Sequence, residues 1–403
     1  MKWEKVKLGE LYTVHNGLSK SREFFGSGFP FLSFSTVFNN YFIPEQLSDL
    51  VQSNEKEQSS YSILRGDVFV TRTSETADEL GISCVALKDY PYATYNGFTK
   101  RMRPIDVERV SPKYIGYYMR WERFRAKFQA FSTMTTRASL RNEELLGLEI
   151  SLPPIEIQEK IADILSAYDD LIENNQKQIK LLEEAAQRLY KAWFVDFRFP
   201  GHESTPIING IPKGWKKGAV NSVVSLLSGY SFKSSEFTED GLYKLVTIKN
   251  VKDGEFDGEK VCFIKELPQK MPSHCILKDG DILLSLTGNV GRVCIVHGKH
   301  YLLNQRVAKF KTEFPAYAYF LFRSDDMVAT LNNLANGVAQ QNLSPIRTEN
   351  LNIHIPSQGV LMSFERNVYP MLNRIVTLNK QITSLRESRD RLLPKLMSGE
   401  LEV

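Results

Sequence analysis

Residues 161–193 read IADILSAYDDLIENNQKQIKLLEEAAQRLYKAW, and residues 364–396 read FERNVYPMLNRIVTLNKQITSLRESRDRLLPKL. Mostly apolar positions step forward by 4, 3, 4, 3 in both stretches, at a constant offset of 203 residues. The first set is Ile161, Leu165, Tyr168, Ile172, Asn175, Ile179, Leu182, Ala186, Leu189 and Trp193; the second is Phe364, Val368, Met371, Ile375, Leu378, Ile382, Leu385, Arg389, Leu392 and Leu396. Such spacing over about ten turns is typical of a long helix that packs against another helix as in a coiled coil. It predicts two long helices in a duplicated chain.

The repeat extends beyond the two helices. SPKY at 111–114 matches FPAY at 314–317, and LEISLP at 148–153 matches LNIHIP at 351–356, both at the same offset. Earlier in each half the offset is larger. LRGDVFV at 64–70 corresponds to KDGDILL at 278–284, an offset of 214 residues. The segments between these matches differ in length and sequence. We therefore expect a repeated framework whose two copies carry different central segments.

Each half combines short β-rich runs with a helix that begins at Pro112 or Pro315. The expected fold class is α+β, with two repeated α+β domains separated by two long helices that form an antiparallel coiled coil. The expected boundaries are 1–152 for the first domain, 153–197 for the central helix, 198–214 for a turn-rich linker, 215–356 for the second domain and 357–403 for the last helix.

The two helices differ in charge. Residues 156–194 contain eight acidic and five basic side chains, whereas residues 365–400 contain four acidic and seven basic ones. Helices of opposite charge should prefer each other to a second copy of themselves. The residues expected to pair the helices are Ile172, Asn175, Ile179, Leu182, Ile375, Leu378, Ile382 and Leu385. Asn175 and Asn379 either fix the register of the pair from buried positions or lie hydrated at its edge, and the sequence leaves both open.

Composition indicates an ordinary globular protein, with 42% hydrophobic and 24% charged residues. No stretch approaches the roughly 18 consecutive apolar residues of a membrane span, and the first residues lack the apolar core of a secretion signal. Four cysteines without a CxxC pair fit a reducing compartment. We expect a cytoplasmic protein.

Motifs for catalysis are missing from the sequence. There is no GxxxxGK[ST] phosphate loop, no Asn/Asp-Pro-Pro-aromatic tetrapeptide for holding a flipped base, and no HExxH among the six histidines. These observations predict no catalytic residues and no metal site in this chain.

Three further motifs carry a resemblance to a known family. They are PPIEIQEKI at 153–161, IPKGW at 211–215 and RLLPKLMSGEL at 391–401. With the duplicated framework, nearly the whole chain resembles the specificity subunit of a type I restriction-modification system. The second helix entry departs from the pattern, because SQGV at 357–360 lacks the usual Glu-Gln signature.

The resemblance implies a non-catalytic subunit that reads a bipartite target in double-stranded DNA, one half with each domain. It also implies that the helices space the two readers and dock two methyltransferase subunits and restriction subunits, with no membrane partner. S-adenosylmethionine, ATP and Mg would then be bound by those partners, and no cofactor by this chain. A helix of about 35 residues is roughly 50 Å long, and half-sites on B-DNA recur about every 34 Å, so such a spacer fits one or two turns of DNA.

Residues that contact DNA should combine cations for phosphates with amides, hydroxyls and arginines for base edges. Four regions of each half have this composition: the turn after the opening strand, the loop after the Gly-Asp strand, a basic or amide-bearing strand region, and the loop before the closing strand. In the first half the candidates are Ser19, Lys20, Arg22, Arg72, Thr73, Lys100, Arg101, Arg103, Thr136 and Arg137. In the second half they are Ser231, Lys233, Thr287, Asn289, Arg292, Gln305, Arg306, Gln340, Gln341 and Asn342.

Two alternatives remain at this point. A self-contained DNA-modifying enzyme would need a donor pocket or metal cluster, and a coiled-coil scaffold protein without DNA specificity would need no divergent loops on a repeated frame.

Overall fold

The computed structural model describes residues 3–74, 79–129, 138–335 and 342–403. The chain divides into two compact units, namely residues 1–171 with 385–403 (unit 1) and residues 172–384 (unit 2). Two long helices, α7 (Ile155–Tyr190) and α11 (Gln358–Ser398), contribute residues to both units.

Unit 1 is built on a four-stranded antiparallel sheet in the order β2-β9-β5-β7 and a three-stranded sheet in the order β4-β3-β8. The strands of the larger sheet are β2 (Tyr12–Asn16), β9 (Thr99–Pro104), β5 (Val68–Thr71) and β7 (Ser83–Val85); those of the smaller are β4 (Leu50–Val51), β3 (Phe25–Leu32) and β8 (Thr94–Tyr95). Two further ladders pair β1 (Glu4–Lys7) with β11 (Glu149–Leu152), and β6 (Thr73–Ser74) with β10 (Ala138–Ser139). The helices are α1 (Leu8–Leu11), α2 (Phe34–Asn39), α3 (Glu55–Ser60), α4 (Pro112–Arg120), α5 (Glu122–Gln129) and α6 (Asn142–Gly147).

Unit 2 repeats this arrangement, with sheets in the orders β15-β21-β18-β19 and β17-β16-β20. The strands are β15 (Ser225–Ser228), β21 (Val307–Lys311), β18 (Ile282–Ser285), β19 (Val293–Ile295), β17 (Cys262–Ile264), β16 (Tyr243–Val246) and β20 (Tyr301–Leu303). A ladder of β14 (Lys216–Ala219) with β22 (Asn352–Ile355) joins the start of the domain to its end, as β1 with β11 does in unit 1. The remaining elements are the hairpin β12 (Ile207–Ile208) and β13 (Ile211–Pro212) and the helices α8 (Pro315–Phe322), α9 (Asp325–Ala335) and α10 (Pro345–Glu349).

The shared topology confirms the α+β fold with a repeated domain. Both smaller sheets pair one strand antiparallel and one parallel to the central strand. The Gly-Asp motifs form equivalent turns, since Asp67 Oδ2 accepts the Leu64 N–H at 2.7 Å and Asp281 Oδ2 accepts the Lys278 N–H at 2.8 Å. The glycines before them have φ values of +91° and +87°, which glycine adopts at little cost.

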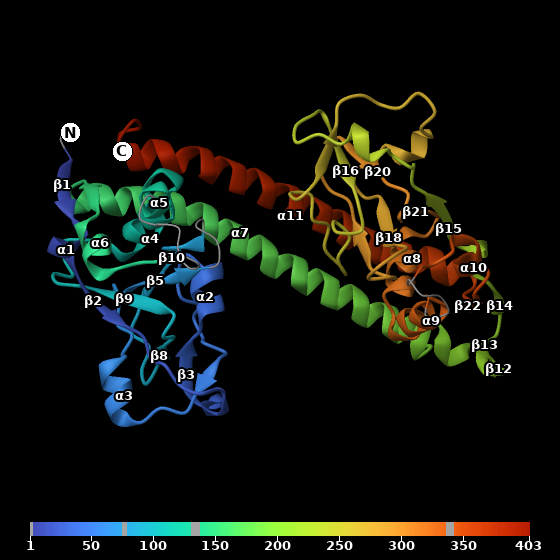
Figure 1. Cartoon of the computed structure of the whole chain (residues 1–403). Coiled ribbons are helices and arrows are strands. Elements are labelled where there is room, and N and C mark those ends of the chain that lie inside the picture. Colours follow the sequence, from blue (N-terminus) through green and yellow to red (C-terminus); the bar gives the residue numbers. More distant parts are fainter. Residues whose placement is uncertain (1–2, 75–78, 130–137, 336–341) are drawn as a thin grey trace. The chain divides into compact units, whose positions relative to one another are not determined.

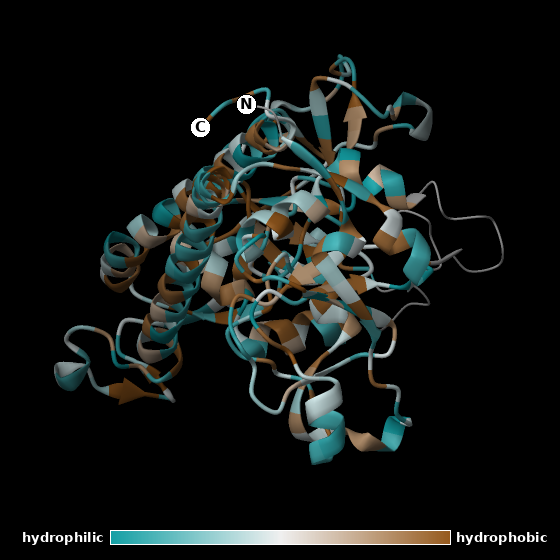
Figure 2. Ribbon diagram, turned by 90° about the vertical axis from the view of Figure 1, so that its left-hand side faces the viewer, coloured by the Kyte–Doolittle hydropathy of each residue, from teal (hydrophilic) through white to brown (hydrophobic). Residues whose placement is uncertain are grey.

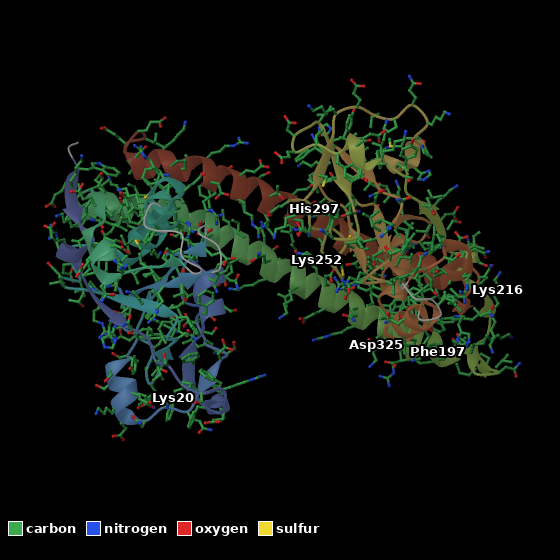
Figure 3. All side chains as sticks on the ribbon, viewed as in Figure 1. Lys20, Phe197, Lys216, Lys252, His297 and Asp325 are labelled. Carbon is green, nitrogen blue, oxygen red and sulfur yellow. The ribbon has the colours of Figure 1, made fainter. Side chains whose placement is uncertain are left out.

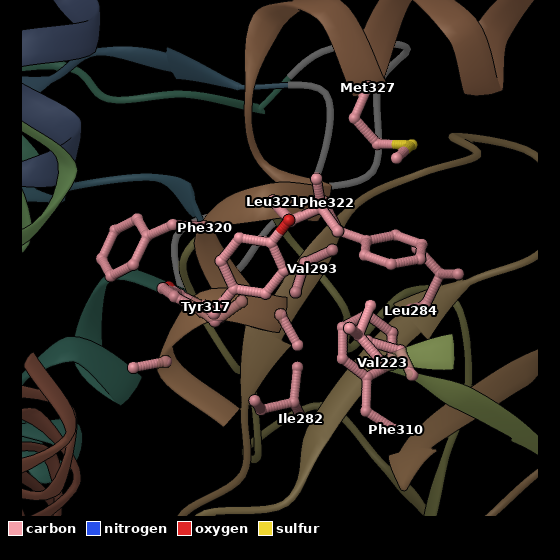
Figure 4. Packing of buried hydrophobic residues seen from close by; sticks show 14 of the residues in the cluster. Val223, Ile282, Leu284, Val293, Phe310, Tyr317, Phe320, Leu321, Phe322 and Met327 are labelled. Atoms are coloured by element: carbon pink, nitrogen blue, oxygen red, sulfur yellow. The ribbon is translucent and has the colours of Figure 1, made fainter. Parts of the chain in front are cut away.

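The core of unit 2 lies between the larger sheet and α8. Tyr317, Phe320 and Phe322 of α8 pack against sheet residues that include Leu284 and Val293 (Figure 4). In α8 every residue after Pro315 is buried, which explains why this helix is apolar on all sides. The core of unit 1 likewise joins α4 to β5 and to the first turns of α7.

Within each unit the two long helices lie side by side and run antiparallel (Figure 1). In unit 1 the Ile161–Leu165 segment shares a core with Leu393 and Leu396, and Arg389 forms an ion pair with Asp169. In unit 2 Asn175 bonds to Gln381 and Gln178 bonds to Arg374, so residue numbers fall along α11 as they rise along α7. This confirms the antiparallel pair expected from the sequence.

No position of either 4,3-spaced set is exposed, which explains the period of the pattern. Figure 2 shows hydrophilic and hydrophobic residues alternating along the turns of the long helices. The expected pairing residues Ile172, Asn175, Ile375, Leu378 and Ile382 are buried, and Ile179, Leu182 and Leu385 are half-buried.

The two seam asparagines differ in their contacts. Asn175 is 8% exposed, and its Nδ2 donates to Gln381 Oε1 of the facing helix at 3.3 Å. Asn379 is half-buried and donates to the Ile375 carbonyl of its own helix at 3.1 Å. Of the two, only Asn175 therefore bonds to the facing helix, as a residue that fixes the register must.

Candidate nucleic-acid interface

The strand register of unit 1 brings the predicted loops to one end of the larger sheet. The last residue of β2, Asn16, pairs with Lys100 near the start of β9, and the last residue of β5, Thr71, pairs with Thr99. Because β2 and β5 both run antiparallel to β9, the loops that follow them lie beside the turn that precedes β9. Beyond β5, Thr73 pairs with Ser139, two residues after the fourth predicted region.

Unit 2 has the same arrangement. Ser228 at the end of β15 pairs with Ala308, and Ser285 at the end of β18 pairs with Val307. A bridge between Thr287 and Asn342 then places the fourth region beside the second. We call these two sites the sheet-end surfaces of units 1 and 2.

The loop after the Gly-Asp strand is closed in the same way in both units. The Thr71 hydroxyl accepts the Ile82 N–H at 2.9 Å, and the Ser285 hydroxyl accepts the Arg292 N–H at 3.1 Å. The fourth region is attached by a matching bond, since the Leu140 N–H donates to the Arg72 carbonyl at 2.9 Å and the Leu343 N–H to the Leu286 carbonyl at 2.8 Å. Different sequences therefore sit on one hydrogen-bonded frame.

Many of the sequence-predicted residues are accessible on these surfaces. Ser19, Arg22, Ser231, Lys233, Asn289, Gln305, Arg306 and Asn342 are exposed, while Lys20, Arg72, Thr73, Thr287 and Arg292 are half-buried. Thr136, Arg137, Gln340 and Gln341 lie outside the described residues. The assignment of these side chains to DNA contacts stays a prediction.

The two arginines of β9 are held within unit 1. Arg101 is 8% exposed, donates to the Ser62 carbonyl at 2.7 Å and stacks on the Tyr95 ring at 5.5 Å. Arg103 forms a two-pronged ion pair with the fully buried Asp67 at 2.6 and 2.8 Å. These contacts give the two arginines structural partners.

Lys100 and Lys20 are also partnered. Lys100 is 6% exposed and its ammonium bonds to the Asn142 side chain, while burial lowers the pKa of Lys100. Lys20, labelled in Figure 3, contacts Glu57 of α3 at 2.8 Å and the Gln52 carbonyl at 2.6 Å. Its ammonium lowers the pKa of Glu57, so this carboxylate is ionised at neutral pH.

The sequence analysis missed Phe98. This side chain is 61% exposed at the turn between β8 and β9, and the backbone N–H of Arg72 donates to its carbonyl at 3.0 Å. An aromatic residue directly after Asn96-Gly97 in an otherwise polar turn was the available signal.

The described part of the chain offers no group of three or more His, Cys, Asp or Glu side chains suited to a metal ion. No helix in the same residues is long and apolar enough to cross a membrane.

Comparison with known proteins identifies the family. The family described as type I restriction modification DNA specificity domain matches residues 1–184 and again residues 212–360. The chain belongs to this family. Each match includes one α+β domain of the chain with its sheet-end surface, so the specificity domain occurs twice.

Related proteins share the full length of this chain. It is 28% identical to the type I restriction enzyme MjaIX specificity subunit of Methanocaldococcus jannaschii, over 100% of this chain and 94% of the relative. It is 21% identical to the HindI specificity subunit of Haemophilus influenzae, over 99% of both chains. The crystal structure of a type I S subunit from M. genitalium matches with a TM-score of 0.59 and 15% identity, over 98% of this chain and 96% of that one, which shows a common fold.

Proposed function

We propose that this chain is the non-catalytic DNA-recognition subunit of a type I restriction-modification complex. Each sheet-end surface reads one half of a bipartite target in double-stranded DNA, and the paired helices dock methyltransferase and restriction subunits. Membership of the specificity-domain family and the relatives named above support this role.

One observation carries the proposal. The two units carry divergent, polar loops on the same backbone frame, at the same end of the same sheet. Loops on a rigid scaffold are where proteins usually place recognition, and amides, hydroxyls and arginines are the side chains that read base edges. A scaffold protein without DNA specificity would have no need of this divergence.

In this role the chain works with partners in the cytoplasm. The methyltransferase subunits flip an adenine in each half-target and use S-adenosylmethionine, and the restriction subunits use ATP and Mg. This chain supplies position and sequence choice, with no cofactor of its own.

The test is to map N6-methyladenine in a host that lacks other methyltransferases and expresses this chain with its cognate methyltransferase subunit. We expect methylation at one split motif. Replacing residues 1–152 with those of a relative should change one half of the motif only, and replacing 215–356 should change the other half. Absence of any methylated motif, or a change of both halves in either hybrid, would refute the proposal.

A further inference from the structure

The turn before β9 in unit 1 and the turn before β21 in unit 2 are the same structure at equivalent places. The Thr99 N–H donates to the Asn96 carbonyl at 3.0 Å, and the Val307 N–H donates to the Asn304 carbonyl at 3.0 Å. Isolated parallel bridges join Asn96 to Leu18 and Asn304 to Tyr230. The two asparagines are therefore equivalent.

The loop after the opening strand packs closely on both turns. A Cβ on Gly17 would lie 2.0 Å from the Asn96 carbonyl oxygen, and a Cβ on Gly229 would lie 2.1 Å from that of Asn304. Only glycine permits this approach without a shift of the backbone. The repeat thus retains both the asparagine and the glycine that shape the turn.

The residue at the tip of the turn has changed between the repeats. The Phe98 carbonyl accepts the Arg72 N–H at 3.0 Å, and the Arg306 carbonyl accepts the Leu286 N–H at 3.0 Å, so Phe98 and Arg306 occupy the same position. Phe98 is 61% exposed and Arg306 is also exposed. No hydrogen bond or ion pair joins the Arg306 side chain to another residue in the described ranges.

The side chain of Arg306 contrasts with three basic side chains of the two sheets. Arg101 and Arg103 are engaged within their unit, and Lys309 of β21 pairs with Asp281 at 2.8 Å. The exposure of Phe98 is equally unusual, because moving a large aromatic side chain out of water is favourable. Both tips are thus held by backbone hydrogen bonds and present an exposed side chain.

We infer that this position determines one base pair of each half-target. Phe98 reads an A·T pair through apolar contact with the thymine methyl group, and Arg306 reads a G·C pair through two hydrogen bonds to guanine O6 and N7. Apolar side chains recognise the thymine methyl group in the major groove, and arginine is the usual partner of guanine there. The inference rests on the proposed function and adds to it the specificity-determining residue of each unit.

The experiment maps methylated adenines for the complex with Phe98→Ala and with Arg306→Gln. We expect Phe98→Ala to relax one A·T position in one half-target, with roughly fourfold loss of discrimination, the value of one methyl group removed from water, while the other half stays as in the wild type. Arg306→Gln should change one position of the other half from guanine to adenine, since glutamine pairs with adenine.

Matched controls lie at the opposite end of the same sheets. Leu64 is 41% exposed before β5, and Lys278 is exposed before β18. Leu64→Ala and Lys278→Ala should leave the motif unchanged. If Phe98→Ala abolishes all methylation, Phe98→Leu must restore the wild-type motif, because leucine keeps an apolar contact.

The outcomes distinguish failure of the proposed function from failure of the assignment of the tip residues. A wild-type complex without any split motif would defeat the proposed function itself. A wild-type split motif that neither tip variant alters, or that both control variants alter equally, would overturn the assignment of the tip and leave the proposed function standing.

Discussion

Arg323 at the end of α8 lies 2.8 Å from Glu183 of α7, and the same carboxylate accepts the Tyr319 hydroxyl at 2.7 Å. Arg323 also contacts Asp253 at 3.0 Å and stacks on the Tyr319 ring at 4.8 Å. Despite burial, Tyr319 and these carboxylates raise the pKa of Arg323 above its ordinary value. The cluster fixes the core helix of unit 2 to the long helix.

Breaking this cluster should destabilise unit 2. Replacing Glu183 with Ala removes the acceptor that Arg323 and the Tyr319 hydroxyl share and leaves Asp253 as the carboxylate that still pairs with Arg323. Losing the charged acceptor of a half-buried pair costs about 2 kcal/mol. Chemical denaturation monitored by tryptophan fluorescence measures the loss.

The neighbouring Glu184 is the matched control for this prediction. It forms a helical i,i+4 pair with Arg188 at 3.7 Å, with side chains that are 42% and 83% exposed. Glu184→Ala should cost no more than about 0.5 kcal/mol. Equal losses for both variants would show that the cluster has no special role.

Much of this fold was accessible from the sequence because its signals are local. The 4,3 spacing follows from the burial of one helix face, and the Gly-Asp turns follow from a positive φ and a side-chain cap. Matching the repeats also located the described turns that the strand register brings to each sheet end.

The burial of Lys100 and Arg101 could not be predicted in this way. Adjacent residues of a strand point to opposite faces, and both faces of β9 are covered by segments distant in sequence, one of which supplies Ser62 and the other Asn142. The equivalence of Phe98 and Arg306 was hidden for a related reason. Their offset of 208 differs from that of either flank, so only backbone hydrogen bonds reveal it.

Replacing Asn175 with Leu should raise the stability of the helix pair. Asn175 is buried in an apolar seam and has one hydrogen bond, to the exposed Gln381, which water can replace. A buried leucine gains more than one such bond loses, and a gain of about 1 kcal/mol corresponds to an increase in Tm of about 2–4 °C. Differential scanning calorimetry of the full chain checks this.

Asn379→Leu serves as the comparison, because Asn379 bonds only to its own helix at Ile375. It should change Tm less than Asn175→Leu does. An unchanged or lower Tm for Asn175→Leu would refute the view that Asn175 trades stability for register.

The stability of unit 2 should fall between about pH 4.5 and pH 7 because of Glu365. Burial raises the pKa of this carboxyl to about 7, although it accepts backbone N–H groups of Ala316 at 3.1 Å and Tyr317 at 2.8 Å. A raised pKa means that the folded state binds the proton more tightly. The stability that protonated Glu365 adds to the folded state is therefore fully present below the unfolded pKa. It is lost as pH rises through the folded pKa.

Glu365→Gln removes this titration, so the free energy of unfolding should depend less on pH across the same window, by about 2–3 kcal/mol in total. Glu387→Gln on the exposed face of the same helix is the control and should leave the slope unchanged. Urea titrations at pH 5, 6, 7 and 8 provide the measurement. A wild-type slope retained in Glu365→Gln would contradict the assignment.

Under the proposed function, the length of the helix pair should set the gap between the two half-targets. A heptad inserted after Gln176 of α7, with a second heptad after Lys380 of α11, preserves the apolar seam because the pair repeats every seven residues. Seven helical residues add about 10 Å, which equals the rise of about three base pairs. Methylation mapping should then show a longer gap between two unchanged half-targets. Seven residues inserted into the 198–214 linker make the control, and the same lengthening of the gap there would show that the helices do not set it.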